Sequence, residues 1–84
     1  MRNLAQRRRR TVDYKNLNEH LNEEYQGVIE YVDLYKKTDE GIFMDMAREE
    51  MTHAKHLEWY INKAGQLTDH SKEKEAAEKA LCEV

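Results

Sequence analysis

Two segments of the chain carry residues at alternating steps of three and four, the spacing of a helix face that packs against another helix. We call these positions the seam. In the first segment, expected to be helical over residues 13–37, they are Leu17, Leu21, Glu24, Val28, Tyr31 and Tyr35. In the second, expected over residues 40–64, they are Phe43, Met46, Glu50, His53, Leu57, Tyr60 and Ala64. No proline interrupts either segment, so the sequence predicts an all-α fold.

The helices are separated by a short turn, "KTDEG", in which Thr38 or Asp39 is expected to cap the second helix. A turn this short predicts an antiparallel helical hairpin over residues 13–65. Gly65 ends it, and "LTDH" opens a short third helix in residues 66–84 with the apolar stripe Ala77, Leu81 and Val84. The chain of 84 residues is therefore expected to be one small domain with a thin core.

Three ionisable residues occupy seam positions that should be dry. A turn centred near residues 38 and 39 makes the numbers of facing residues sum to about 77. Glu24 then faces His53, and residue 27 faces Glu50. The polar residue of the first helix therefore meets both polar residues of the second.

A bound metal ion accounts for such a cluster. A buried, unpaired carboxylate costs several kcal/mol, whereas carboxylate oxygens and a neutral imidazole are ordinary metal ligands. Four-helix carboxylate proteins build a di-metal site from a Glu on each of two helices and Glu-x-x-His on each of the other two. Glu24 and the Glu50-x-x-His53 pair supply half of that set. The sequence thus predicts a homodimer whose four-helix bundle encloses a site shared between subunits.

Glu24-x6-Tyr31 followed by "EMTH" at residues 50–53 resembles the half-motif of ferritin-like di-iron proteins, which include rubrerythrins. With two long helices, the chain is most similar to the encapsulated ferritins, whose hairpins form a four-helix bundle on pairing. The resemblance covers about residues 13–65. It implies that Glu24, Glu50 and His53 bind iron, two ions per dimer, and that Tyr31 is a phenol beside the metal. The implied activity is that of a ferroxidase, which oxidises Fe²⁺ with O₂ or peroxide for iron storage or detoxification.

The resemblance has limits. In the encapsulated ferritins an acid one before and another two after the site Glu form a metal-uptake site, with a Trp six after it. Here Glu23 fits the first, whereas Gln26 and Glu30 replace the other two. The C-terminal "ALCEV" does not look like the tag that directs cargo into an encapsulin shell, so enclosure in such a nanocompartment has no sequence signal. Ring-like oligomers are suggested by an apolar face at Tyr25, Ile29 and Val32, outside the seam.

The N-terminus is basic and the remainder is acidic. "MRNLAQRRRR", with the run Arg7–Arg10, holds five arginines and no acid, while the remaining residues hold nine basic and 17 acidic side chains. We expect residues 1–12 to be a disordered, solvated arm. Nucleic-acid binding is not favoured, because no aromatic residue lies among the arginines to stack on bases. No apolar run approaches the roughly 20 residues that cross a bilayer, and no signal peptide is recognised, so the expected location is the cytoplasm.

Other interpretations remain open at this stage. Glu24 can pair with His20 one turn earlier, and His53 can be a core histidine hydrogen-bonded to Glu49 or Glu50. Tyr31 can be ordinary seam packing, and Cys82 shows no sign of being a nucleophile. At the level of function, the hairpin can be a non-catalytic interaction module whose polar seam residues fix register. It can also be a metal-binding regulator whose arginine arm contacts nucleic acid.

Overall fold

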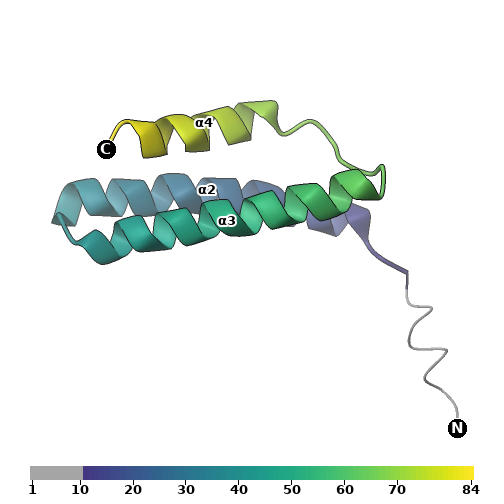
Figure 1. Ribbon diagram of the computed structural model, residues 1–84, viewed down its shortest axis with the longest axis horizontal. Coiled ribbons are helices and arrows are strands. Elements are labelled where there is room, and N and C mark those ends of the chain that lie inside the picture. The colour runs from purple at the N-terminus through teal and green to yellow at the C-terminus, as the bar shows by residue number, and fades with distance from the viewer. Residues whose placement is uncertain (1–10) are drawn as a thin grey trace, which may run out of the picture.

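The computed structural model describes residues 11–84, which form three helices: α2 (Tyr14–Thr38), α3 (Gly41–Lys63) and α4 (Ser71–Cys82). α2 and α3 lie side by side as an antiparallel hairpin, and α4 lies along one side of it (Figure 1). The predicted all-α hairpin with a short third helix is therefore confirmed in this part of the chain. Most of the predicted arm, residues 1–10, lies outside the described residues. No helix within residues 11–84 is long and apolar enough to cross a bilayer.

The hairpin is set by its caps and its turn. Asp13 caps α2, since its side chain accepts a hydrogen bond of 3.0 Å from the Asn16 N–H. At the other end Asp39 adopts φ 59° and its N–H donates to the Tyr35 carbonyl, which ends α2 in a left-handed residue. Glu40, and not Thr38 or Asp39, is the N-cap of α3; the Thr38 hydroxyl accepts from the Glu40 N–H. The predicted cap position was therefore one or two residues early.

The core lies between all three helices, and this changes which face of α3 is buried. The fully or nearly buried apolar side chains are Leu21, Tyr25, Val28, Val32, Met44, Ala47, Met51, Ala54, Ile61 and Ala77. On α2, Leu21 and Val28 are the predicted seam positions. On α3 the buried positions are each one residue beyond the predicted seam, whose own members are half-buried or exposed. The prediction considered only two facing helices, whereas packing against α4 turns the interior toward it.

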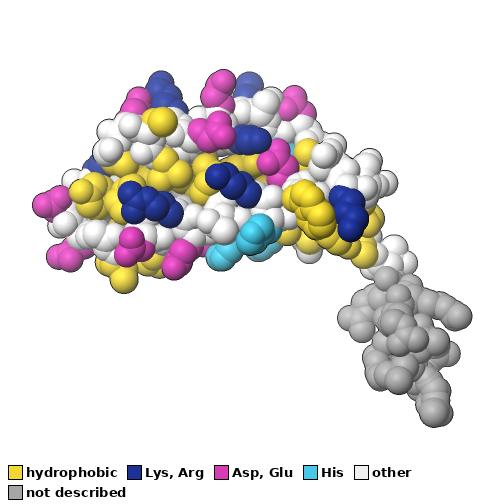
Figure 2. All heavy atoms as spheres, in the orientation of Figure 1, with side chains coloured by type: hydrophobic (Ala, Val, Ile, Leu, Met, Phe, Trp, Pro, Cys, Tyr) yellow, Lys and Arg dark blue, Asp and Glu magenta, His cyan; other side chains and the backbone are white. Residues whose placement is uncertain are grey.

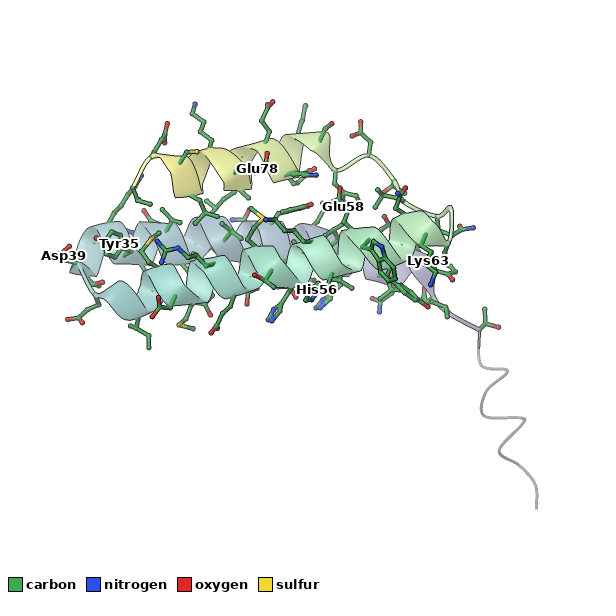
Figure 3. All side chains as sticks on the ribbon, viewed as in Figure 1. Tyr35, Asp39, His56, Glu58, Lys63 and Glu78 are labelled. Atoms are coloured by element: carbon green, nitrogen blue, oxygen red, sulfur yellow. The ribbon has the colours of Figure 1, made fainter. Side chains whose placement is uncertain are left out.

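α4 covers the face of α2 that was expected to be open. Tyr25 and Val32 are almost completely buried, and Ile29 packs against the core. Glu58 of α3 and Glu78 of α4 lie on this side of the hairpin (Figure 3), and burial together with these two carboxylates raises the pKa of Tyr25 to about 12. The apolar face proposed for ring contacts is therefore occupied within the chain itself. α4 also begins at Ser71, after the "LTDH" that was expected to open it.

Candidate metal centre

The residues of α2 and α3 that face each other are those predicted from the turn. The Nδ1 atom of His53 lies 3.6 Å from the Oε1 atom of Glu24. A Cβ atom placed on Gly27 would lie 2.9 Å from the Oε1 atom of Glu50. In both pairs the residue numbers add up to 77, as predicted from the turn between the helices. The structure therefore brings Glu24, Glu50 and His53 together from two helices.

We call Glu24, Glu50 and His53 the carboxylate cluster. One ligand atom from each residue lies within 4.8 Å of the other two. The Nδ1 atom of His53 is also 4.0 Å from a Glu50 oxygen. The exposed fractions of the side chains rise from 11% for Glu24 to 27% for Glu50 and 55% for His53. The cluster is thus closed at Glu24 and open to solvent at His53.

Glu24 has an oxygen atom without a partner. Its Oε1 is the one buried side-chain nitrogen or oxygen atom in residues 11–84 that has no hydrogen-bond partner. The 3.6 Å that separates it from His53 Nδ1 is too long for a hydrogen bond. Buried polar atoms are normally paired, because desolvating one without a partner costs about 1–3 kcal/mol. With both carboxylates ionised, this buried oxygen faces the interior of the cluster without a donor, and a protonated Glu50 or a cation would satisfy it.

Glu24 and Glu50 also carry like charges at close range. A hydrogen bond with Glu24, burial and Coulomb repulsion by Glu24 together raise the pKa of Glu50 to about 7, although His53 and His20 oppose the shift. The pair thus holds a proton more readily than separate carboxylates do. A cation between the two groups removes the same repulsion.

Gly27 makes room for Glu50. This glycine lies inside α2, where glycine costs about 1 kcal/mol relative to alanine. Any larger residue places a Cβ against the Glu50 carboxylate, at 2.9 Å from one oxygen and 3.3 Å from the carboxyl carbon. The missing side chain therefore lets a carboxylate of α3 lie directly against the backbone of α2.

The residues of the carboxylate cluster fit a transition-metal ion. Two carboxylates and an imidazole are the donors that such ions prefer, and the unpaired Glu24 oxygen is the atom that a cation would satisfy. Tyr31 lies on α2 two turns after Glu24, and its ring stacks on Phe43 at a centroid distance of 6.4 Å. This contact accounts for Tyr31 as packing, and its role beside a metal stays a prediction.

The alternative pairing of Glu24 with His20 is present at the same time. The Nε2 atom of His20 lies 3.2 Å from the Oε2 atom of Glu24. The two interpretations left open by the sequence are therefore not exclusive, because the two oxygens of Glu24 face different histidines.

Histidine side chains gather on the edge of the hairpin away from α4 (Figure 2), and there His56 points into solvent (Figure 3).

A second polar cluster was not predicted. Asn18, Asn22, Thr68 and His70, which we call the amide cluster, join α2 to the connection before α4. Asn18 Nδ2 donates to the carbonyls of Tyr14 and Gln66, and its Oδ1 accepts from the N–H of Thr68. The ring of His70 lies 2.8 Å from Asn18 Oδ1 and 2.6 Å from Asn22 Oδ1. Two asparagines four residues apart inside a helix were a signal for it, since asparagine is a poor helix former.

No protein-family model, curated protein or solved structure matches this chain. No relative therefore shows that this chain belongs to the ferritin-like family. A functional assignment depends on the geometry of the carboxylate cluster alone.

Proposed function

We propose that the chain binds Fe²⁺ at the carboxylate cluster of a paired hairpin and oxidises it to Fe³⁺. The observation that carries this proposal is the buried Oε1 atom of Glu24, which has no hydrogen-bond partner and faces Glu50 and His53. A non-catalytic seam would be expected to pair its buried polar atoms within the protein. An unpaired carboxylate oxygen beside a second carboxylate and an imidazole instead suits a cation.

Pairing of two chains is part of the proposal, because each chain supplies three donors. His53 is more than half exposed on this face, so a second copy has room to approach it. Apolar seam residues on the same face are only partly covered, among them Tyr31, Phe43, Met46 and Leu57. A twofold pair would bury these side chains and bring two carboxylate clusters together. The charge of two Fe²⁺ ions would then balance the two Glu24 and two Glu50 carboxylates.

In this proposal Fe²⁺ is the substrate. Each Fe²⁺ gives up one electron, so two Fe²⁺ ions with two protons from solvent reduce one O₂ to hydrogen peroxide, or one hydrogen peroxide to two waters. The ions leave as Fe³⁺ for storage or detoxification in the cytoplasm. Glu24 and Glu50 bind the cation, and their negative charge favours the Fe³⁺ product. His53 provides the nitrogen donor, and apolar seam residues of a second copy would limit the access of water to it. Tyr31 on α2 is proposed to place its phenol beside the metal.

The first test compares cluster residues with matched neighbours. We expect Glu50→Ala and His53→Ala to lose bound iron and Fe²⁺ oxidation, because each substitution removes two donors from a twofold site. Glu49→Ala and His56→Ala are the controls, since both residues are exposed on the same helix. Iron is measured by elemental analysis of protein purified without chelator, and oxidation by absorbance of the Fe³⁺ product. Normal oxidation in either cluster variant would place the activity elsewhere.

The second test links metal binding to association. Metal-free pairing crowds like charges together, whereas Fe²⁺ or Zn²⁺ favours the paired state that it binds. Sedimentation should therefore show a shift toward dimer when Zn²⁺ is added. Calcium should have little effect, since it prefers a larger set of oxygen ligands. If Zn²⁺ leaves the equilibrium unchanged, the polar seam residues only fix register and the site between subunits is wrong.

Deleting residues 1–10 serves as a further control. The arm lies outside the hairpin in the sequence, so we expect iron oxidation to be unchanged. Loss of oxidation in this variant, or salt-dependent binding of the full chain to DNA, would favour a regulator that uses the arginines.

A further inference from the structure

The second oxygen of Glu24 has its own histidine. His20 lies one turn before Glu24 on α2, and its Nε2 atom is 3.2 Å from Glu24 Oε2. On the other side of the ring, His20 Nδ1 lies 3.3 Å from an oxygen of Glu23. The imidazole is thus placed between two carboxylates. Its side chain is 51% exposed, so ions reach it from solvent.

The contact with Glu23 orients the ring for ligation. Histidines that bind metals usually donate their other N–H to a carboxylate, which fixes the tautomer and the ring direction. When Nδ1–H donates to Glu23, Nε2 of the neutral ring carries a lone pair that faces Glu24 Oε2. In this tautomer the two acceptors repel each other, and either a proton on Nε2 or a metal ion between the two atoms removes the repulsion.

The distance also suits a shared metal ion. Donors bound to one ion at about 2.0–2.2 Å lie about 2.8–3.6 Å apart, for bond angles between 90° and tetrahedral. The separation of His20 Nε2 from Glu24 Oε2 falls in this range. An ordinary pair between residues four apart on a helix has similar spacing. Glu24 differs from such a pair because it is buried and its other oxygen has no partner.

We propose that His20 Nε2 and Glu24 Oε2 hold a second divalent transition-metal ion, while Glu24 Oε1 serves the position formed with Glu50 and His53. Glu24 is then a bridging carboxylate with one cation on each oxygen. Each chain takes up two cations, an inner one at the carboxylate cluster and an outer one at His20. This inference rests on the metal binding in the proposed function but not on its redox chemistry.

The test counts metal ions in the full-length protein and needs no activity. Metal-free protein carrying Cys82→Ser, which removes an exposed thiol ligand, is titrated with Zn²⁺ in a calorimeter. A parallel titration with Co²⁺ follows the visible absorption, which changes when an imidazole ligand is lost. We expect His20→Ala to lose one equivalent of metal and to keep the inner one. His56→Ala is the control, because it removes an exposed histidine outside both positions and should lose none.

The outcomes separate this inference from the proposed function. Glu50→Ala and His53→Ala should remove the inner equivalent. If the native chain and His20→Ala each bind one equivalent, the metal position at His20 does not exist, but metal binding at the carboxylate cluster is supported. If His20→Ala binds the inner ion more tightly without losing an equivalent, His20 is a competitor and the inference is wrong. If the native chain binds no metal, both proposals fail. Circular dichroism confirms that each variant remains helical.

Discussion

The amide cluster and the carboxylate cluster are both polar, both partly buried and both anchored on α2, yet they differ in how their atoms are satisfied. Asn18 uses both its amide hydrogens and its oxygen within the protein. Glu24 leaves one buried oxygen without a partner and lies beside a second carboxylate. In the first cluster each polar side-chain atom of Asn18 has a partner within the protein. The second has a buried oxygen that a cation would satisfy.

The comparison shows that burial of polar groups does not by itself indicate function. A hydrogen-bonded polar network adds to stability and fixes the position of a segment. Here it holds His70, the residue before α4, against Asn18 and Asn22. Like charges and an unpaired oxygen lower stability instead, so their presence needs another explanation. We therefore expect substitutions in the two clusters to change stability in opposite directions.

The largest effect is expected in the amide cluster. Asn18→Leu leaves the carbonyls of Tyr14 and Gln66 and the N–H of Thr68 without this partner, so we expect the free energy of unfolding to fall by about 3 kcal/mol. Guanidinium unfolding at a fixed protein concentration measures it. Zn²⁺ uptake by the folded fraction should remain. An unchanged midpoint would show that the cluster is not structural.

The carboxylate cluster should respond with the opposite sign. Glu24→Gln keeps the size of the side chain but removes the charge that repels Glu50. After allowance for the partial exposure of Glu50, we expect the metal-free protein to gain about 1 kcal/mol at about pH 8. If the chains pair as proposed, the metal-free dimer of Glu24→Gln should also be tighter, and metal-driven association should be weaker. A loss of stability, measured as for Asn18→Leu, would mean that Glu24 makes net favourable contacts.

The same repulsion predicts a pH dependence. The folded protein raises the pKa of Glu50 from 4.5 to about 7, so between these pH values the folded state holds a proton that the unfolded state has released. The contribution of Glu50 to stability therefore decreases as pH rises through this window. Unfolding midpoints of the native protein and Glu24→Gln should diverge from pH 5 to pH 8. Parallel pH profiles would contradict the raised pKa.

The smallest change in stability is expected at Gly27. Alanine favours the helix, but its Cβ displaces the end of the Glu50 side chain, so we expect stability to change by less than about 1 kcal/mol. Zn²⁺ affinity should fall nonetheless, because Glu50 can no longer lie against α2. Calorimetry measures the affinity, and Gly41→Ala is the control since that position has open space. Unaltered affinity would show that Glu50 binds metal from another position.

The sequence predicted the carboxylate cluster more accurately than the core around it. Residue numbers across a short turn determine which side chains face each other, so Glu24 with His53 and Gly27 with Glu50 followed from counting. The buried face of α3 did not follow, because it depends on where α4 packs. The path of residues 64–70 carries no periodicity that would place it. The amide cluster was missed for the same reason, since Asn18 and His70 are far apart in the sequence.

If the chains pair as proposed, the coverage of Tyr25 and Val32 by α4 would limit how far the assembly grows. α2 has two apolar faces, and a chain with both exposed could add copies without limit. With α4 packed against it, one of these faces is buried within the chain, and the seam is the face that a second copy would cover. Twofold pairing through the seam consumes it on both chains, so the pair would terminate there. α4 would thus prevent association beyond the pair, and detaching α4 would expose a second apolar face through which the pairs could polymerise.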